Sequence, residues 1–299
     1  MSSFRRGFLY SFASAILFGF VPLITLMTDQ SGASPYMIVL LKSPLALIPL
    51  MIILRIHPEK HGHFTHRDWL QLALVSFLKT ATEVLLFLSY RYVSTGNATV
   101  IHFTYPLFVL IMGALLFREQ ITWKDALCFA LCTAGIAMMF RPKEGGTPLG
   151  FVLALSSGVC FGMFTLLTDK FELIKRIGNA RVTLICYLFS FAYMILFCLA
   201  TGTFTLNLTF RSYALIALLT LVDGIVAVML LQAGIQYAGG RVASLVSVVE
   251  PVTSIIVGII ILNETATAAN LIGSLLILSA SILLVVFERE NAPPPDSSS

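Results

Sequence analysis

Long runs of apolar residues alternate with short polar breaks along almost the whole chain. The runs are about 20 residues long, which is the length that an α-helix needs to cross the hydrocarbon core of a membrane. The pattern therefore predicts an all-α integral membrane protein with ten transmembrane helices. We place these helices at residues 7–28, 35–56, 68–91, 95–117, 122–140, 148–169, 181–201, 211–236, 241–262 and 267–287.

Both ends of the chain fit this interpretation. The start, MSSFRRGFLYSFASAILFGFVPLITLM, has a basic flank and an apolar run, as a signal peptide does. The run is too long for a signal peptide and no small-residue cleavage site ends it, so we interpret it as the first span. Residues 291–299 are rich in Pro and Ser and are predicted to form a disordered cytoplasmic tail.

Composition agrees with the pattern. Hydrophobic residues make up 58% of the 299 residues and charged residues only 11%, against about 25% charged residues in soluble domains. The net charge of +4 reflects loop residues and does not indicate binding to nucleic acid. The five cysteines lie in apolar runs without a CxxC pair, and we interpret them as small buried hydrophobic residues. We expect no metal and no cofactor.

Basic residues in the polar breaks predict the orientation. Thirteen Lys and Arg residues lie on the side of the N-terminus and four on the opposite side, while Lys42 and Lys79 fall inside spans. Cytoplasmic loops carry the excess of Lys and Arg. Both termini are therefore predicted to be cytoplasmic.

Two pairs of segments show that the chain contains an internal repeat. GFLYSFASAILFG, from Gly7, aligns with GFVLALSSGVCFG, from Gly150. YVSTGNATVIHFTYPLFVLIMGALLFREQIT, from Tyr92, aligns with YAGGRVASLVSVVEPVTSIIVGIIILNETAT, from Tyr237. The two shifts differ by only two residues. We predict two five-helix units at residues 1–145 and 146–290.

The odd number of helices in each unit has a structural consequence. The second unit enters the membrane from the opposite side, so the two units are expected to form an inverted repeat. This architecture is common in secondary transporters, whose halves rock around a site at the midplane of the bilayer.

The repeated segments quoted above resemble the EamA family of the drug/metabolite transporter superfamily. The signature is a short turn, a helix with Pro106 or Pro251 in its middle, and Glu119 or Glu264 just past its end. The resemblance covers nearly the whole chain. It implies a ten-helix carrier that exports small metabolites, often amino acids or their relatives, from the bacterial cytoplasm through a central cavity.

One position departs from the family pattern. Family members often carry Arg in the second helix, where this chain has Lys42. The positive charge is kept, but the bidentate geometry of a guanidinium is lost.

Lys79 and Glu83 lie one helical turn apart in the third predicted helix and share one of its faces. Ionisable groups inside a membrane face the bundle interior or a wet cavity. The pair either neutralises itself and fixes packing, or contacts a zwitterion or relays protons. The second unit has Gly224 and Val228 at the equivalent positions, so the scaffold does not require the pair.

Further polar residues complete the candidate substrate site, together with Lys42. Ser247, Glu250 and Ser254 form a polar stripe that is expected to line the cavity. The equivalent stripe in the first unit is Thr99, His102 and either Tyr105 or Pro106, and Tyr105 is the repeat equivalent of Glu250. On its own, His102 is also compatible with a satisfied histidine of the core.

Asp223 has no basic residue one turn away on its own helix. It must pair with Lys42 or Lys79, be hydrated, or be protonated. We therefore consider it as a candidate for proton coupling, with a salt bridge as the alternative.

Two other groups have simpler explanations. His57, His61, His63 and His66 lie in one polar break and are expected to be solvated rather than to bind a metal. Glu119 and Glu264 are expected to tie down the short turn before the next helix.

The sequence thus predicts a carrier that moves a small polar or zwitterionic, amino-acid-like metabolite across the cytoplasmic (inner) membrane, as efflux. A channel, or a lipid or drug translocator without a zwitterion site, is the alternative. HExxH, GxGD and GxSxG are absent from the sequence, which disfavours an intramembrane enzyme. The expected partners are the substrate and the bilayer, without nucleic acid, and a homodimer is left open.

Overall fold

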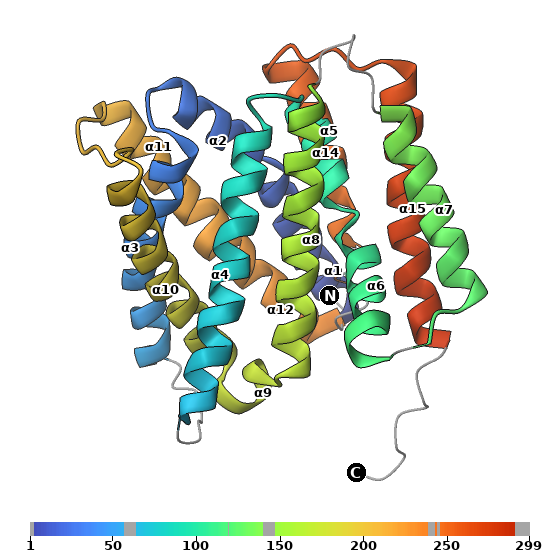
Figure 1. Cartoon of the computed structure of the whole chain (residues 1–299), viewed down its shortest axis with the longest axis horizontal. Helices are drawn as coiled ribbons and strands as arrows, with labels where there is room; N and C mark the ends of the chain where they lie inside the picture. The colour runs from blue at the N-terminus through green and yellow to red at the C-terminus, as the bar shows by residue number, and fades with distance from the viewer. Residues whose placement is uncertain are drawn as a thin grey trace.

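A computed structural model describes residues 3–56, 64–118, 120–139, 147–238, 243 and 246–290. The regular elements in these ranges are all helical (Figure 1). They are α1 (Ser3–Gly19), α2 (Val21–Gln30), α3 (Pro35–Ile56), α4 (His66–Ser89), α5 (Thr95–His102), α6 (Tyr105–Phe117), α7 (Trp123–Met139), α8 (Pro148–Lys170), α9 (Leu173–Ile177), α10 (Asn179–Ala200), α11 (Phe210–Leu221), the π-helix η1 (Val222–Ala227), α12 (Val228–Ala238), α14 (Val249–Ile261) and α15 (Ala268–Glu290).

Seven helical stretches are long and apolar enough to cross a membrane. They are Phe4–Gln30, Pro35–Ile56, His66–Ser89, Thr95–Phe117, Pro148–Lys170, Asn179–Ala200 and Phe210–Leu231. The other three predicted spans correspond to α7, α14 and α15, whose apolar parts are shorter in the described residues. The protein is therefore a multi-pass membrane protein built from helices.

Some sequence expectations fall outside the described residues. These are the tail at residues 291–299, the start of the predicted helix at 241–262, and the side chains of His57, His61, His63 and Glu119. The short helix α9 lies in the polar break between two predicted spans and was not expected.

Several predicted spans are interrupted in their middle, which the apolar pattern did not predict. The first is broken at Phe20, just before Pro22, and the fourth at Phe103 and Thr104, just before Pro106. A turn at Val248 precedes α14, which carries Pro251 near its start. Proline lacks a backbone donor and clashes with the preceding turn, which favours a break at these positions, whereas α3 continues through Pro44 and Pro49.

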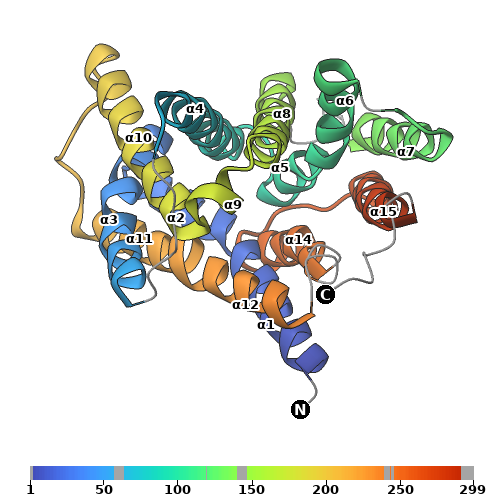
Figure 2. The ribbon, with the colours of Figure 1, turned by 90° about the horizontal axis from the view of Figure 1, so that it is seen from below.

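The helices pack in pairs (Figures 1 and 2). α4 lies along α8, α12 along α1, α3 along α10, and α7 along α15. Seen from below, α7 and α15 lie at one end of the molecule and α3, α10 and α11 at the other (Figure 2). The broken helices α5 and α14 lie between these ends, where they pack against each other.

Glycine allows two of the closest helix contacts. A Cβ atom on Gly19 of α1 would lie 2.4 Å from the Cβ of Thr253 and 2.9 Å from the carbonyl oxygen of Glu250. A Cβ atom on Gly162 of α8 would lie 2.9 Å from the carbonyl oxygen of Tyr105. A larger residue at either position would push apart the helices that carry the candidate site.

Glu264 has a structural role, but with a different partner from the one expected. Its Oε1 accepts hydrogen bonds from the backbone N–H of Thr95 (2.7 Å) and from its hydroxyl (2.9 Å). Glu264 thus caps the first turn of α5 in the other half of the chain, instead of the turn before its own next helix. A carboxylate there satisfies a free donor and complements the helix dipole.

This cap generates a test of the fold. Glu264→Ala is expected to cost about 1 kcal/mol of stability, a typical value for a lost N-terminal cap. Glu264→Gln is expected to cost less, because its amide oxygen still accepts while the charge is lost. The midpoint of thermal unfolding of the purified protein in detergent would measure both. Equal midpoints for wild type and Glu264→Ala would contradict the capping role.

Candidate functional site

A cavity of about 440 Å³ lies among the central helices. This volume falls in the range of roughly 300–1,000 Å³ found for small-molecule sites. Helices from both halves of the chain form its wall, and all the candidate site residues are part of its lining. These are Lys42, Lys79, Glu83, His102, Tyr105, Asp223 and Glu250.

A chain of ion pairs crosses one side of the cavity. Lys79 Nζ contacts Glu83 Oε1 within α4, as the spacing predicted. The second carboxylate oxygen, Glu83 Oε2, lies 3.1 Å from Lys42 Nζ of α3. Lys42 also contacts Asp223 Oδ2 of η1. Two ammonium and two carboxylate groups therefore neutralise one another.

Lys42 is the most deeply buried member of this chain. Only 1% of its side chain is exposed, against 16–20% for the other three members. Its ammonium group is already paired with the carboxylates of Glu83 and Asp223. Lys42 therefore positions Glu83 and Asp223, whereas these acids and Lys79 present surface to the cavity.

The sequence left several environments open for Asp223. In the structure it pairs with Lys42, across the boundary between the two halves. Asp223 lies in η1, and short π-helical segments inside α-helices occur frequently at functional sites. The residue pattern VDGIVA gave no sign of this helix type.

Two aromatic rings contact the lysines and were missed by the sequence analysis. Lys79 Nζ lies 4.5 Å from the ring centroid of Tyr187, and Lys42 Nζ lies 5.7 Å from that of Phe87. Aromatic faces attract cations. For Tyr187 the available signal was a tyrosine in the middle of an apolar span, since a buried hydroxyl group needs a polar neighbour.

His102 of α5 is partly satisfied within the protein. Its Nδ1 lies 3.0 Å from Ser157 Oγ of α8, and that hydroxyl donates to the carbonyl of Ala154 at 2.6 Å. Since the hydroxyl proton is used there, we assign Nδ1 of His102 as the donor, and in a neutral ring Nε2 is then an acceptor. The ring also packs against Phe161 and Tyr105, with centroids 5.2 and 6.0 Å away.

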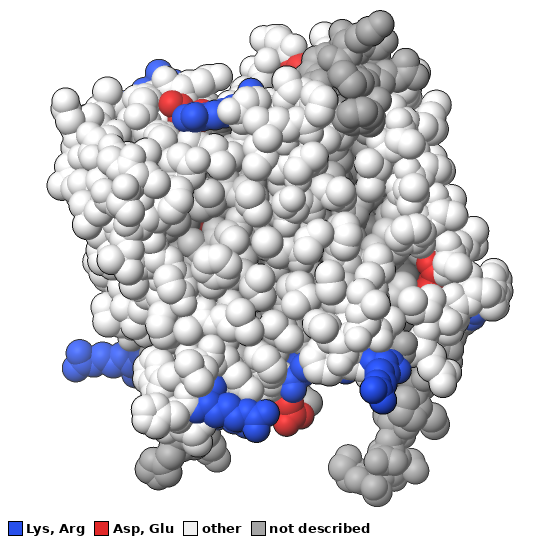
Figure 3. All heavy atoms as spheres, in the orientation of Figure 1, with Lys and Arg blue, Asp and Glu red and all other residues white. Residues whose placement is uncertain are grey.

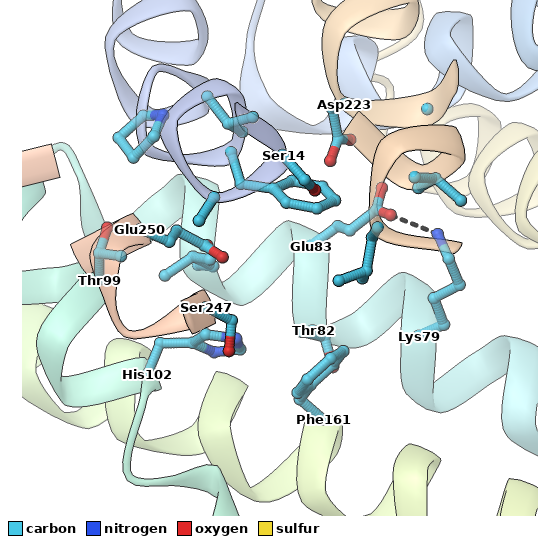
Figure 4. Close-up of a pocket in the computed structure, with 18 of the residues that line it drawn as sticks. Ser14, Lys79, Thr82, Glu83, Thr99, His102, Phe161, Asp223, Ser247 and Glu250 are labelled. Atoms are coloured by element: carbon cyan, nitrogen blue, oxygen red, sulfur yellow. Dashed lines mark hydrogen bonds and ion pairs between the residues drawn. The ribbon is translucent and has the colours of Figure 1, made fainter. Parts of the chain in front are cut away.

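The two predicted polar stripes meet where α5 and α14 pack together. Ser254 Oγ donates to Thr99 Oγ1 at 3.3 Å, and Thr99 donates to the carbonyl of Thr95 at 2.8 Å. Glu250 lies on this side of the cavity, close to Ser247 and His102 and apart from the chain of ion pairs (Figure 4). No cation among the described residues forms an ion pair with its carboxylate.

Two further ion pairs hold the ends of α4, outside the cavity. Near its start, Asp68 Oδ1 lies 2.7 Å from Arg176 Nη1 of α9. Just past its end, Arg91 donates through Nε (2.7 Å) and Nη2 to the carboxylate of Asp29 in α2. These hydrogen bonds raise the pKa of the Arg91 guanidinium above its usual value.

The outer surface in Figure 3 shows Lys and Arg side chains gathered along its lower edge.

Comparison with known proteins identifies relatives over nearly the whole chain. The sequence model of the EamA-like transporter family matches residues 5–141 and 148–286. An uncharacterized transporter of Clostridium kluyveri is 21% identical over 93% of both chains. An S-adenosylmethionine uptake transporter of Rickettsia bellii is 26% identical over 65% of both chains. A solved crystal structure with 14% identity shares the fold, with a TM-score of 0.60 over 95% of this chain and 98% of its own.

The chain of ion pairs generates a test of the site. Lys42→Met leaves two carboxylates without their shared partner, and unpairing a buried charge costs about 3–5 kcal/mol. Asp223→Asn is expected to cost less, because Lys42 keeps its contact with Glu83. Thermal unfolding of the purified variants in detergent would rank them. An unfolding midpoint for Lys42→Met at or above that of Asp223→Asn would contradict the central position of Lys42.

Proposed function

The chain belongs to the EamA-like transporter family, and we propose that it is a secondary transporter for a small polar or zwitterionic, amino-acid-like metabolite. The observation that carries this proposal is the cavity between the halves, with ammonium and carboxylate groups side by side in its wall. Such a wall offers partners to both ends of a zwitterion. The proposed location is the cytoplasmic (inner) membrane.

Alternating access by two inverted five-helix repeats is the proposed mechanism. Two sets of contacts support the inverted arrangement. Gly19 and Gly162 are equivalent in the repeat, and so are Glu250 and Tyr105. Gly19 lies against the backbone carbonyl of Glu250, and Gly162 lies against that of Tyr105. The packing of α4 along α8 likewise has its counterpart in α12 along α1.

The pair of Lys42 and Asp223 links the two halves at the cavity. A substrate ammonium group would compete for Glu83 and Asp223, and a substrate carboxylate would compete for Lys79. Weakening these internal pairs would loosen one half from the other and favour reorientation. Protonation of Asp223 would have the same effect, which would couple transport to proton exchange; the substrate gradient itself is the other source of energy.

Efflux is the proposed direction. The relative in Rickettsia bellii gives a reason to keep uptake as the second candidate, because its name describes uptake of S-adenosylmethionine. That compound has a zwitterionic amino-acid end, which fits the wall formed by Lys79 and Glu83. A channel or a lipid translocator would lack saturable counterflow, whereas a carrier requires it.

Transport is tested by comparing the metabolites in the medium of cells that express wild type, Glu83→Ala or Asp223→Ala. One metabolite class is expected to accumulate outside with wild type, and the accumulation should fall about tenfold or more in each variant, as expected for loss of a charged contact. Equal amounts of protein in the membrane are the control. Unchanged accumulation in both variants would rule out the proposed site; depletion of a metabolite from the medium would favour uptake.

The orientation is tested with single cysteines in a variant from which the five native cysteines have been removed. Asn207 and Glu172 are both exposed, in the breaks after α10 and after α8. With cytoplasmic termini, Asn207→Cys should react with a membrane-impermeant maleimide in intact cells. Glu172→Cys should react only after permeabilisation, and the reverse pattern would invert the proposed topology.

A further inference from the structure

The charged groups of the cavity do not balance. In the lining that the structure describes, Lys42 and Lys79 face three carboxylates, those of Glu83, Asp223 and Glu250. Both lysines are already paired with Glu83 and Asp223. With these groups ionised and His102 neutral, the cavity carries one negative charge in excess, and it belongs to Glu250.

The neighbours of Glu250 do not compensate this charge. The hydroxyl groups of Thr99 and Thr253 donate to backbone carbonyls, and that of Ser254 donates to Thr99. In the neutral ring of His102, with Nδ1 assigned as the donor to Ser157, the remaining ring nitrogen is an acceptor. None of these groups carries a positive charge, so a ligand that neutralises the Glu250 carboxylate must supply that charge itself.

Aromatic rings surround the same side. Phe161 and Tyr105 form an edge-to-face pair with centroids 4.7 Å apart, and both pack against the His102 ring. Figure 4 shows Glu250 and His102 on one side of the cavity and Lys79 and Glu83 on the other, and Phe161 packs against the ring of His102. Aromatic faces bind cations and planar groups without requiring a hydrogen bond.

The geometry points to Glu250 as the binding site for a positively charged group, and hence to a substrate that is an organic cation of net charge +1 with an aromatic or other planar apolar part. This inference rests on the proposed transport function and narrows its small polar substrate to cations, in place of a zwitterion without net charge. A strictly zwitterionic substrate would leave the charge of Glu250 uncompensated. A cation that enters the cavity restores electroneutrality. This stabilises the complex, because an unpaired charge is costly in a low-dielectric environment.

The rival explanation is that Glu250 only carries a proton. Glu250→Gln separates the two ideas, because glutamine resembles a protonated glutamate in shape and lacks its charge. A cation site loses affinity on this substitution. A residue that only carries a proton keeps the affinity and loses the coupling of transport to pH.

The test uses calorimetric binding to the purified full chain in lipid nanodiscs. The probes share one skeleton: phenethylamine (+1), benzyltrimethylammonium (a fixed +1), phenylalanine (zwitterion), phenethyl alcohol (neutral) and 3-phenylpropionate (−1). Wild type should bind the two cations most tightly. Glu250→Gln should weaken both by about tenfold or more, as expected for loss of a charged contact, and should leave the alcohol unchanged. Glu264→Gln is the matched control, because it makes the same substitution at the cap outside the cavity.

Three results would overturn the inference: no binding of either cation, equal cation affinity in wild type and Glu250→Gln, or tighter binding of phenylalanine or 3-phenylpropionate than of phenethylamine. Counterflow in proteoliposomes separates this failure from failure of the proposed function. Saturable counterflow of phenylalanine that Glu250→Gln retains would refute the cation site and leave the transporter. Binding of the cations with the expected loss in Glu250→Gln, but without counterflow of any probe, would refute the transport mechanism and leave the site.

Discussion

The structure depends on one buried ammonium group. Lys42 is 1% exposed in a helix that is otherwise an apolar span, and Glu83 and Asp223 stabilise its charge there. These three residues come from three helices and from both halves of the chain. The ion pairs therefore fix how α3, α4 and η1 are placed relative to one another, and with them one wall of the cavity.

The opposite wall of the cavity, with Glu250 and His102, depends on breaks in the helical backbone rather than on ion pairs. Two spans are interrupted just before Pro106 and Pro251. Gly19 and Gly162 allow neighbouring helices to approach the backbone beside these breaks. Broken helices expose polar groups inside a membrane only where they line a cavity or contact protein. Glu250 and His102 lie at these interruptions, so their position follows from local backbone chemistry.

Most of the fold could be predicted from the sequence, because the hydrophobic pattern of a membrane helix is long and strong. The boundaries of α3 and of the stretch from α5 to α6 agree with the predicted ranges. The six ionisable candidates could also be predicted to lie inside the protein, since charges avoid lipid, and Tyr105 followed as the repeat equivalent of Glu250. The partners could not: the pairing of Lys42 with Asp223, the cap that Glu264 places on Thr95 and the π-helix of η1 all depend on contacts between distant segments.

The separation of Lys42 and Asp223 along the chain has a consequence for biosynthesis. The two residues are 181 positions apart, so at ribosomal rates of about 5–20 residues per second Asp223 is made roughly 10–40 s after Lys42. Of the two carboxylates that pair with Lys42 in the structure, only Glu83 has been synthesised during that interval. The pair of Lys42 and Glu83 thus allows the ammonium group to enter the bilayer before the second half has been synthesised. Asp223 then adds the ion pair that joins the two halves.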